Sequence, residues 1–329
     1  MSACVCGLDV HKDSTYATIL DRDGTIVSQG RMVNDRVLSY LAQYPVDRIG
    51  MEASNQVAPL YRELRRKGYT VLISHPKKTR YIAEARIKSD RIDSKAIAEL
   101  MRLDALPPAY MPDEGIAVLR EKIRRRAFLV RERVKLRVKI KSLLTYEGIK
   151  PPSQYGLFTR KGVAWLHSLA LEPVASYLRV IAPLDAEIRQ LSTHLRRLAE
   201  ADEAVRLLMT IPGVGYSTEL LVTSEIGDLT RFRDGDTLCR DAGLVPSTHA
   251  SGGVVRHGGI TREGSRWLRW VMVEAAMVHV HRYATRITRS YHRIAERRER
   301  QVATVAAARK LLLCCYAILK NKRPYYDQA

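Results

Sequence analysis

The sequence of 329 residues has no uninterrupted apolar run approaching the roughly 20 residues that span a bilayer. Its first residues, MSACVCGLDVHKD, lack the basic region and the apolar core of a signal peptide. The sequence also shows no lipidation motif and no isolated amphipathic anchor at a terminus. We therefore expect a cytoplasmic protein that does not attach to a membrane.

Cysteine is scarce, and none of the five cysteines has a CxxC partner or a histidine at zinc-finger spacing. Cys4 and Cys6 share one face of a first apolar segment, Cys239 is isolated, and Cys314 and Cys315 are adjacent. This pattern argues against a zinc finger. We expect reduced, mostly buried thiols.

Acidic residues are in the minority, with 35 Asp and Glu against 55 Lys and Arg, which gives a net charge of +20. Because Lys and Arg displace condensed counterions from phosphates, this excess predicts a polyanionic partner. A generally basic soluble protein is the alternative interpretation. Hydrophobic residues make up 46% of the chain, enough for two or three folded domains.

The first hundred residues alternate between strand and helix signals. Short apolar segments bounded by turn residues predict strands at 5–10, 16–20, 25–30, 48–52 and 70–74. Helical periodicity falls between the later strands, at 37–43 and 59–67. Three hairpin-like strands followed by alternating helix and strand predict an α/β domain with a mixed sheet, the order of the RNase H-like fold.

Prolines at 107, 108 and 112 interrupt this pattern and predict a domain boundary. Residues 114–146 then predict one long, heavily basic helix. Its apolar residues recur at helical spacing and form a stripe: Leu119, Ile123, Ala127, Val130, Val134 and Val138. We expect the stripe to pack against a partner helix and the basic residues to contact nucleic-acid backbone. The candidates for that contact are Arg124, Arg125, Arg131, Lys135 and Lys139. A solvated basic face is the alternative.

A second long helix is predicted from about Pro183 to Ala201, and the two helices can pair as an antiparallel coiled coil. The sequence thus predicts three parts. An α/β domain at 1–106 is followed by a basic coiled-coil region at 113–202 and a mainly helical domain at 203–329.

The last part begins with LLMTIPGVGYSTELLVTSEIG, which resembles a helix-hairpin-helix. Gly213 and Gly215 permit positive φ angles and expose backbone N–H groups that can hold a phosphate. The same residues can equally form an ordinary tight helical turn. A glycine-rich stretch follows at 243–264, and an apolar helix is predicted from Ser265 to about Arg282.

Four acidic residues are candidates for a metal site. Asp9 lies inside an apolar strand, where an unpaired carboxylate would cost several kcal/mol, and Glu52 ends another strand. Asp90 and Asp93 share one face of a helical turn. If the first and fourth strands are neighbours, these carboxylates converge into a set suited to two Mg²⁺ ions. Taken singly, each also has a structural interpretation as a turn residue, a helix cap or a helix-terminal ion-pair partner.

At these residues the chain resembles the DEDD transposases of bacterial insertion sequences, which are bridge-RNA-guided recombinases. The segments GLDVHK, GMEAS and KSDRIDSKAIA match that family's Asp, Glu, Asp and Asp blocks in order. IPGVGYSTELLVTSEIGD, AGLVPSTHASG and GGITREGSRWLRWVMVEAA match its C-terminal domain. The resemblance covers nearly the whole chain, and one departure is Ser94, where alanine often follows the last Asp. It implies a RuvC-type N-terminal domain, a coiled-coil region and a C-terminal transposase domain with a nucleophilic serine.

Carried onto this sequence, that nucleophile is Ser251 in HASGGVVRHGG. On chemistry alone a serine followed by two glycines is a weak candidate, and three other serines are nearby rivals: Ser217, Ser247 and Ser265. We expect a flexible loop here, with cationic side chains that can neutralise a phosphate during attack by the hydroxyl. These side chains are Arg256, His257 and Arg262.

The resemblance implies cleavage and rejoining of DNA through a phosphoserine link, assisted by Mg²⁺. The implied partners are donor DNA, target DNA and a structured noncoding guide RNA, bound by a dimer of dimers in which different subunits complete the active site. One alternative is a metal-only nuclease similar to Holliday-junction resolvases, in which Ser251 takes no part. Another is a non-catalytic nucleic-acid-binding protein, against which the intact set of four carboxylates argues.

Overall fold

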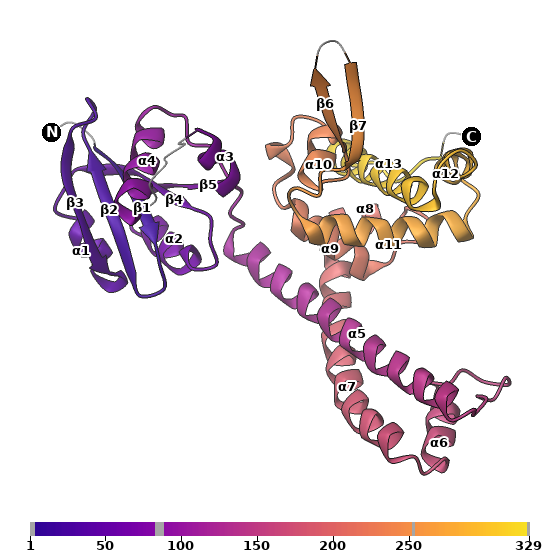
Figure 1. Ribbon diagram of the computed structural model, residues 1–329. Helices are drawn as coiled ribbons and strands as arrows, with labels where there is room; N and C mark the ends of the chain where they lie inside the picture. Colours follow the sequence, from indigo (N-terminus) through magenta and orange to yellow (C-terminus); the bar gives the residue numbers. More distant parts are fainter. Residues whose placement is uncertain (1–3, 83–88, 252–253, 328–329) are drawn as a thin grey trace. The chain divides into compact units, whose positions relative to one another are not determined.

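The computed structural model describes residues 4–82, 89–251 and 254–327 (Figure 1). The chain divides into two compact units, one ending at Met111 and the other beginning at Pro112. Backbone hydrogen bonds attach residues 107–109 to β5 and to His75 after it, which explains why the first unit continues beyond Pro107 and Pro108 and ends just before Pro112. The division of the second unit into a helical-pair region and a C-terminal domain stays a prediction.

The first unit contains a mixed five-stranded sheet with the strand order β3-β2-β1-β4-β5. The strands are β1 (Cys4–Val10), β2 (Ser14–Leu20), β3 (Ile26–Val33), β4 (Val46–Glu52) and β5 (Thr70–Ser74). β1 pairs antiparallel with β2 and parallel with β4, while β2–β3 is antiparallel and β4–β5 parallel. The predicted mixed sheet is confirmed. The first and fourth strands are neighbours, which is the condition for Asp9 and Glu52 to converge.

Side chains of the sheet alternate between two apolar cores. Cys6 and Leu8 pack on one face against α1 (Val37–Leu41) and α2 (Val57–Arg66). The short helix η1 (Asn34–Arg36) precedes α1 and has no buried residue. Val5 faces the other way, against Ile97 and Met101 of α4 (Asp90–Arg102). A further short helix, α3 (Pro76–Ile82), follows β5. The period of two along each strand therefore decides which residues face α4.

Gly7 allows α4 to lie directly on β1. A Cβ atom at this position would be 2.1 Å from the carbonyl oxygen of Ser94 and 2.5 Å from the amide nitrogen of Ala98. Gly50 on β4 is similarly close to Ile97, at 2.7 Å from its Cγ2. At Gly7 the close atoms belong to the helix backbone, so no residue with a side chain would allow this approach, whereas at Gly50 they belong to side chains.

Two long helices form an antiparallel pair at the start of the second unit (Figure 1). They are α5 (Glu114–Tyr146) and α7 (Glu172–Ala201), with α6 (Arg160–Ser168) between them. Arg126 donates to Ser192 at 2.7 Å, and Arg133 to Asp185 at 2.7 Å, so their registers run in opposite directions. The predicted antiparallel pairing is confirmed; that it is a coiled coil stays a prediction.

The predicted start of α7 near Pro183 is wrong, because the helix begins at Glu172 and continues through this proline. Pro183 lacks an amide donor for the carbonyl of Arg179. Both residues lie at exposed positions, where water can satisfy that carbonyl. Val174 and Leu178 are buried in the preceding turns and hold this part of the helix in place.

The predicted apolar stripe of α5 is only partly correct. Ile123 is buried, but Val134 and Val138 are 48% and 54% exposed. Steps of mostly four residues rotate the stripe by about 100° between Leu119 and Val138, because a turn contains only 3.6 residues. The buried positions at the far end are instead Ile140 and Leu144.

The remaining elements form a mainly helical core with one hairpin. They are α8 (Glu203–Leu208), α9 (Tyr216–Ile226), η2 (Leu229–Arg231), α10 (Gly235–Asp241), β6 (Pro246–Ser251), β7 (Val254–Ile260), α11 (Arg266–Arg282), α12 (Arg286–Ala295) and α13 (Arg300–Asn321). The glycine-rich stretch is therefore a hairpin and not the flexible loop we expected. Its β-branched valines suit strand pairing better than an irregular segment.

By length and composition alone, α13 could cross a membrane. Four residues along one side, Ala303, Ala307, Leu311 and Cys315, are nevertheless buried in the core of the second unit. All five cysteines are free, and Cys314 is the one that is not fully buried. The prediction of mostly buried thiols is confirmed; that they are reduced stays a prediction.

Candidate active site

Asp9 and Glu52 are placed by the register of β1 and β4. Leu8 is paired with Met51 in the parallel ladder, so Asp9 and Glu52 are the next residues along their strands. Leu8 and Met51 face the core on the side of α1 and α2. The alternation of side chains therefore puts Asp9 and Glu52 on the face covered by α4, at the carboxyl end of both strands.

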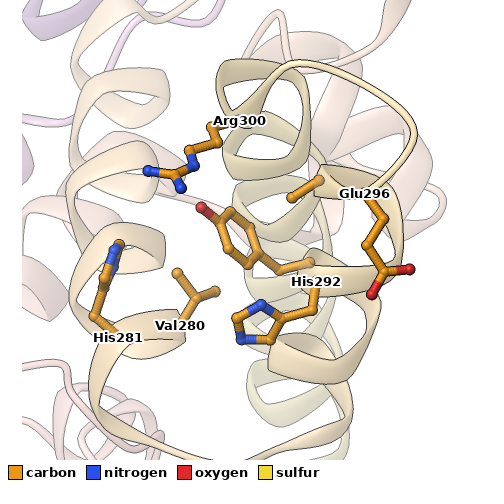
Figure 2. Close-up of a pocket in the computed structure, with 7 residues that line it drawn as sticks. Val280, His281, His292, Glu296 and Arg300 are labelled. Atoms are coloured by element: carbon orange, nitrogen blue, oxygen red, sulfur yellow. The ribbon is translucent and has the colours of Figure 1, made fainter.

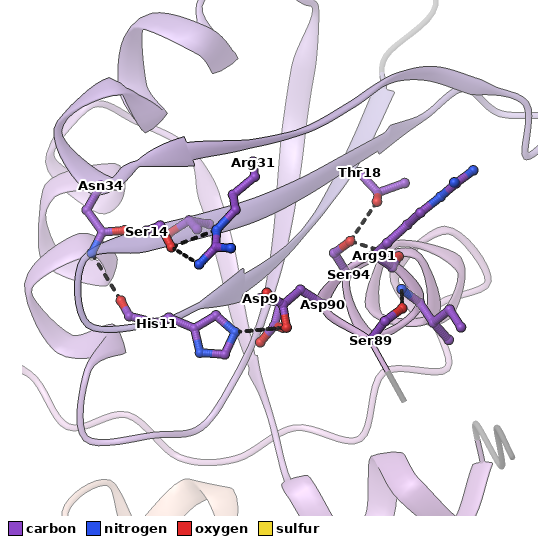
Figure 3. Close-up of polar contacts among 12 residues, drawn as sticks. Asp9, His11, Ser14, Thr18, Arg31, Asn34, Ser89, Asp90, Arg91 and Ser94 are labelled. Atoms are coloured by element: carbon purple, nitrogen blue, oxygen red, sulfur yellow. Dashed lines mark hydrogen bonds and ion pairs between the residues drawn. The ribbon is translucent and has the colours of Figure 1, made fainter. Parts of the chain in front are cut away.

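The first turn of α4 carries Asp90 and Asp93 to the same end of the sheet. Ser89 caps this helix, because its hydroxyl accepts a hydrogen bond from the amide of Ile92. The short contact with Gly7 seats the following turn of the helix on β1. Figure 3 shows Asp9, from the strand, and Asp90, from the helix, close to each other.

Ser94 connects α4 to β2. Its hydroxyl is fully buried, lies 2.7 Å from the Thr18 hydroxyl and donates to the carbonyl of Arg91 at 3.1 Å (Figure 3). Because the single hydroxyl proton of Ser94 is used on Arg91, Thr18 donates to Ser94, and Thr18 accepts from Gln29 at 2.8 Å. The departure from alanine at position 94 thus has a polar partner on the neighbouring strand.

His11 completes a group of three possible metal ligands. Its Nε2 atom lies 3.2 Å from Oδ2 of Asp9 and 3.3 Å from Oδ1 of Asp90. The ligand atoms of Asp9, His11 and Asp90 all lie within 4.8 Å of one another. We did not predict His11 from the sequence. Its signal was present in GLDVHK, because a residue two positions after Asp9 projects to the same side of the strand.

The charges around Asp9 fit a divalent cation. Burial raises the pKa of Asp9, and the carboxylates of Asp93 and Asp90 raise it further, while His11 opposes them. A cation would neutralise this repulsion, and carboxylate oxygens with one imidazole are suitable donors for it. Asp93 is near enough to act on Asp9 by its charge. Glu52 is placed beside Asp9 by strand register, although the group of three does not include it.

In the second unit, Ser251 is the last residue of β6 and is paired with Val254 of β7. The side chains of residues 248–257 lie outside the described part of the structure, so nothing is assigned to the hydroxyl of Ser251 or to the side chains of Arg256 and His257. Arg262 has a positive φ of 55° between β7 and α11. Its charge lowers the pKa of Arg269, although burial of Arg269 is the larger cause.

Two of the rival serines have structural roles. Ser265 caps α11 by accepting from the amide of Leu268, and it donates to Glu225 at 2.9 Å. Ser247 donates to the carbonyl of Gly259 at 3.0 Å across the hairpin. Ser217 lies in the first turn of α9 and is half-buried.

The basic residues of α5 differ in their partners. Arg124 forms an ion pair with Glu225, a carboxylate that is 3% exposed on α9. The guanidinium groups of Arg124 and Arg131 both lie 5.7 Å from the ring of Trp267. Four of the five candidates for nucleic-acid contact are exposed, namely Arg125, Arg131, Lys135 and Lys139. Arg125 pairs with Glu121 and Lys135 with Glu132 on the same helix.

The Pro-Gly-Val-Gly segment is fixed by the corner between α11 and α12. His279 is fully buried, and its Nδ1 donates to the carbonyl of Pro212 at 2.8 Å. Gly213 has a φ of +86°, and a Cβ there would lie 2.8 Å from the ring of Tyr283. Gly215 is the N-cap residue of α9 and provides no side-chain cap. This geometry is compatible with both interpretations of the segment, a phosphate-binding hairpin and a tight helical turn.

Two family models match the chain, the DEDD transposases of the IS110 group at residues 6–147 and the "Transposase IS116/IS110/IS902 family" at residues 205–293. The chain belongs to the IS110 family of transposases. It is therefore an enzyme that cuts and rejoins DNA, and the three grouped ligands lie in the region matched by the first model.

Relatives of known name agree with this family. The chain is 26% identical to a probable family 20 transposase of Pseudomonas aeruginosa, over 97% of each protein. It is 27% identical to the transposase for insertion sequence element IS1111A of Coxiella burnetii, over 98% of this chain and 91% of that protein. A pilin gene-inverting protein of Moraxella bovis is 31% identical over 44% of this chain and 45% of its own length.

Proposed function

We propose that this IS110-family transposase is an RNA-guided DNA recombinase of an insertion sequence, with an RNase H-like, RuvC-type first unit that binds Mg²⁺. The observation that carries the proposal is the approach of Asp9, His11 and Asp90 at the carboxyl ends of two parallel strands. Two separate sequence segments supply these residues, the end of β1 for Asp9 and His11 and the start of α4 for Asp90. A structural role for each acid alone does not account for their grouping.

The metal-binding residues in this proposal are Asp9, Glu52, Asp90 and Asp93, which would hold two Mg²⁺ ions. A bound divalent cation supplies Lewis-acid stabilisation of a phosphodiester and lowers the pKa of an attacking hydroxyl. His11 lies between Asp9 and Asp90 and orients both carboxylates. The close approach of the α4 backbone to Gly7 keeps Asp90 and Asp93 at this end of the sheet.

Ser251 is the proposed nucleophile. Its oxygen attacks a DNA phosphorus, the P–O bond to the departing strand breaks, and that strand leaves with a 3′-hydroxyl after taking up a proton. A 3′-hydroxyl of another strand then attacks the phosphoserine and restores the serine. One phosphodiester is consumed and one is formed, so no external energy source is needed. The roles of Ser247 and Ser265 in hydrogen bonds support Ser251 over these two rivals.

Recognition of the DNA is assigned in this proposal to a structured noncoding guide RNA that pairs with donor and target DNA, bound by a dimer of dimers. The net charge of +20 supports binding of RNA and DNA together, because both are polyanions. Exposed Arg125, Lys135 and Lys139 on α5 provide backbone contacts that do not depend on base sequence. Gly213, Gly215, Arg256 and Arg262 are proposed as further phosphate contacts.

Trapping of a protein–DNA adduct tests the nucleophile. The reaction is run on a nicked substrate with guide RNA, stopped with denaturant, and examined for labelled DNA that migrates with the protein. Ser251→Ala should lose the adduct, whereas Ser168→Ala should keep it, because Ser168 is an exposed serine at the end of α6.

Each outcome of this experiment has a defined meaning. An adduct in the Ser251→Ala protein would assign the nucleophile to another residue. Recombination without any adduct would favour the metal-only nuclease and overturn the phosphoserine part of the proposal. Wild-type protein without guide RNA that recombines equally well would overturn RNA guidance.

A further inference from the structure

A recess lies where the end of α11, the end of α12 and the start of α13 come together (Figure 2). It has a volume of about 330 Å³ and is lined by Val280, His281, Tyr291, His292, Ala295, Glu296 and Arg300. None of these residues belongs to the carboxylate group or to the hairpin of Ser251. The volume is at the lower end of the range for small-ligand sites, which is roughly 300–1,000 Å³.

Three rings form the walls of this recess. The ring of Tyr291 is 6.4 Å from that of His281 and 5.3 Å from that of His292, measured between centroids. Nδ1 of His281 donates to the carbonyl of Met277 at 2.7 Å, which restrains the ring. Tyr291 is 8% exposed, so its position is set by packing. A nucleobase can stack on or against such rings whatever its sequence identity.

The recess carries charges of both signs. Figure 2 shows the guanidinium of Arg300 at the top, the ring of His292 at the bottom and the carboxylate of Glu296 to the right, pointing away from Arg300. Arginine binds a phosphate through charge-assisted hydrogen bonds. A carboxylate accepts hydrogen bonds from the amino groups of bases but repels phosphate. The combination therefore suits a molecule with a phosphate at one end and a base at the other, and not a free phosphate.

The surroundings of the recess are strongly basic. Residues 281–300 contain seven arginines and two glutamates. Arg289 and Arg293 are exposed on α12, and the described residues include no ion-pair partner for either of them. Such a surface attracts the backbone of a nucleic-acid strand towards the recess.

We propose that this recess binds a single unstacked nucleotide of a single-stranded nucleic-acid segment. The base lies against Tyr291 and the two histidines, and its phosphate lies at Arg300. A paired duplex does not satisfy the site, because its bases are stacked on one another and cannot enter. The inference rests on the proposed function to the extent that strand exchange, or a guide RNA, provides such a segment.

The test uses an oligonucleotide of about ten nucleotides, within the usual size of a single-strand site. One version is DNA and the other RNA, each with a fluorescent 2-aminopurine in the middle. Binding to the full-length protein is followed by anisotropy and by quenching of the 2-aminopurine, in buffer that contains EDTA. The variants are Arg300→Gln and His292→Ala, and the matched control is Arg298→Gln, which removes the same charge two residues away but does not line the recess.

We expect Arg300→Gln and His292→Ala to weaken binding of the single strand by roughly fivefold to tenfold. Arg298→Gln should change it by less than about twofold. Quenching should be lost in the two recess variants. Stronger binding of DNA than RNA would identify an exchanged strand as the source, and the reverse would identify the guide RNA.

Equal weakening by Arg300→Gln and Arg298→Gln, with quenching retained, would overturn the inference and leave only a basic surface. Thermal unfolding of each variant shows whether folding is intact, and His292 is exposed, so its replacement should not disturb the core. The absence of divalent metal keeps this test separate from the proposed recombination chemistry. Recombination without a covalent protein–DNA adduct would overturn that chemistry but would not change the result for nucleotide binding.

Discussion

At the carboxyl end of the central strand of the first unit, Asp9 is half-buried beside Asp90, Asp93 and His11. Burial and the two other carboxylates raise the pKa of Asp9, while His11 lowers it. In the second unit, Glu225 is more deeply buried but has Arg124 as its ion-pair partner.

The pKa of Glu219, two turns earlier in α9, is shifted by burial alone, with neither a carboxylate nor a basic side chain in the described part of the chain contributing to it. Its Oε2 atom has no hydrogen-bond partner among the described residues, and burial raises the pKa of Glu219 to about 8. Buried acids in this chain are thus stabilised by a basic side chain or by a proton. Asp9 is the one of these three that lies beside two other carboxylates, and a divalent cation would neutralise the repulsion among them.

The variant Asp9→Asn tests most directly whether Asp9 binds a metal, in contrast to the structural carboxylates of Glu225 and Glu219. We expect it to reduce strand exchange by about a thousandfold or more, because a metal ligand and a negative charge are lost together. In buffer containing EDTA, the melting temperature should stay the same or rise, because repulsion from Asp90 and Asp93 is relieved. Recombination assays and thermal denaturation measure the two effects.

Asp47→Asn is the matched control for this experiment, because Asp47 is an exposed acid on β4. It should leave both activity and stability near the wild-type values. A clear fall in the melting temperature of the Asp9→Asn protein would show that Asp9 is a structural residue, contrary to the comparison.

Removal of the partner of Glu225 should have the next largest effect. Arg124→Ala leaves a buried carboxylate without its cation, and we expect a loss of about 3 kcal/mol in the free energy of unfolding. Arg125→Ala should cost less than about 0.5 kcal/mol, because its pair with Glu121 is exposed on the same helix. Urea denaturation of both variants gives the comparison, and equal losses would contradict the distinction.

The smallest of the three expected effects is a dependence of the free energy of unfolding on pH, caused by Glu219. Its pKa is about 8 in the folded chain and near 4.5 in an unfolded one. Between these values the folded state keeps a proton that the unfolded state loses, so the free energy of unfolding falls as pH rises from about 4.5 towards 8. Glu219→Gln should remove this slope and be more stable than wild type at pH 8, by on the order of 2 kcal/mol.

Chemical denaturation at several pH values between 5 and 8 measures this slope. Glu187→Gln is the control, because Glu187 is exposed on α7 and should leave the profile unchanged. An unaltered slope in the Glu219→Gln protein would mean that Glu219 is ionised in the folded state.

Local patterns were sufficient to predict the sheet and its acidic residues. Alternation along β1 and β4 placed Asp9 and Glu52, and the three-residue spacing placed Asp90 with Asp93. His11 lies just after the last residue of β1, where the alternation within the strand no longer fixes the direction of a side chain.

Other features depend on contacts between distant parts of the chain. The partner of Arg124 lies 101 residues away, on another helix, and no local pattern identifies it. The continuation of α7 through Pro183 depends on burial of Val174 and Leu178 against neighbouring helices. The pairing of β6 with β7 was hidden because glycines at their ends resemble a loop.

Gly7 contributes no atom that could bind a metal, yet it acts as a spacer between the two elements that do. Any side chain there would lift α4 from β1 and carry Asp90 and Asp93 away from Asp9. The distances between the acidic side chains therefore depend on how closely the backbone of α4 approaches that of β1. Replacement of Gly7 by alanine would increase the distances between these carboxylates, although every acidic residue stays in the sequence.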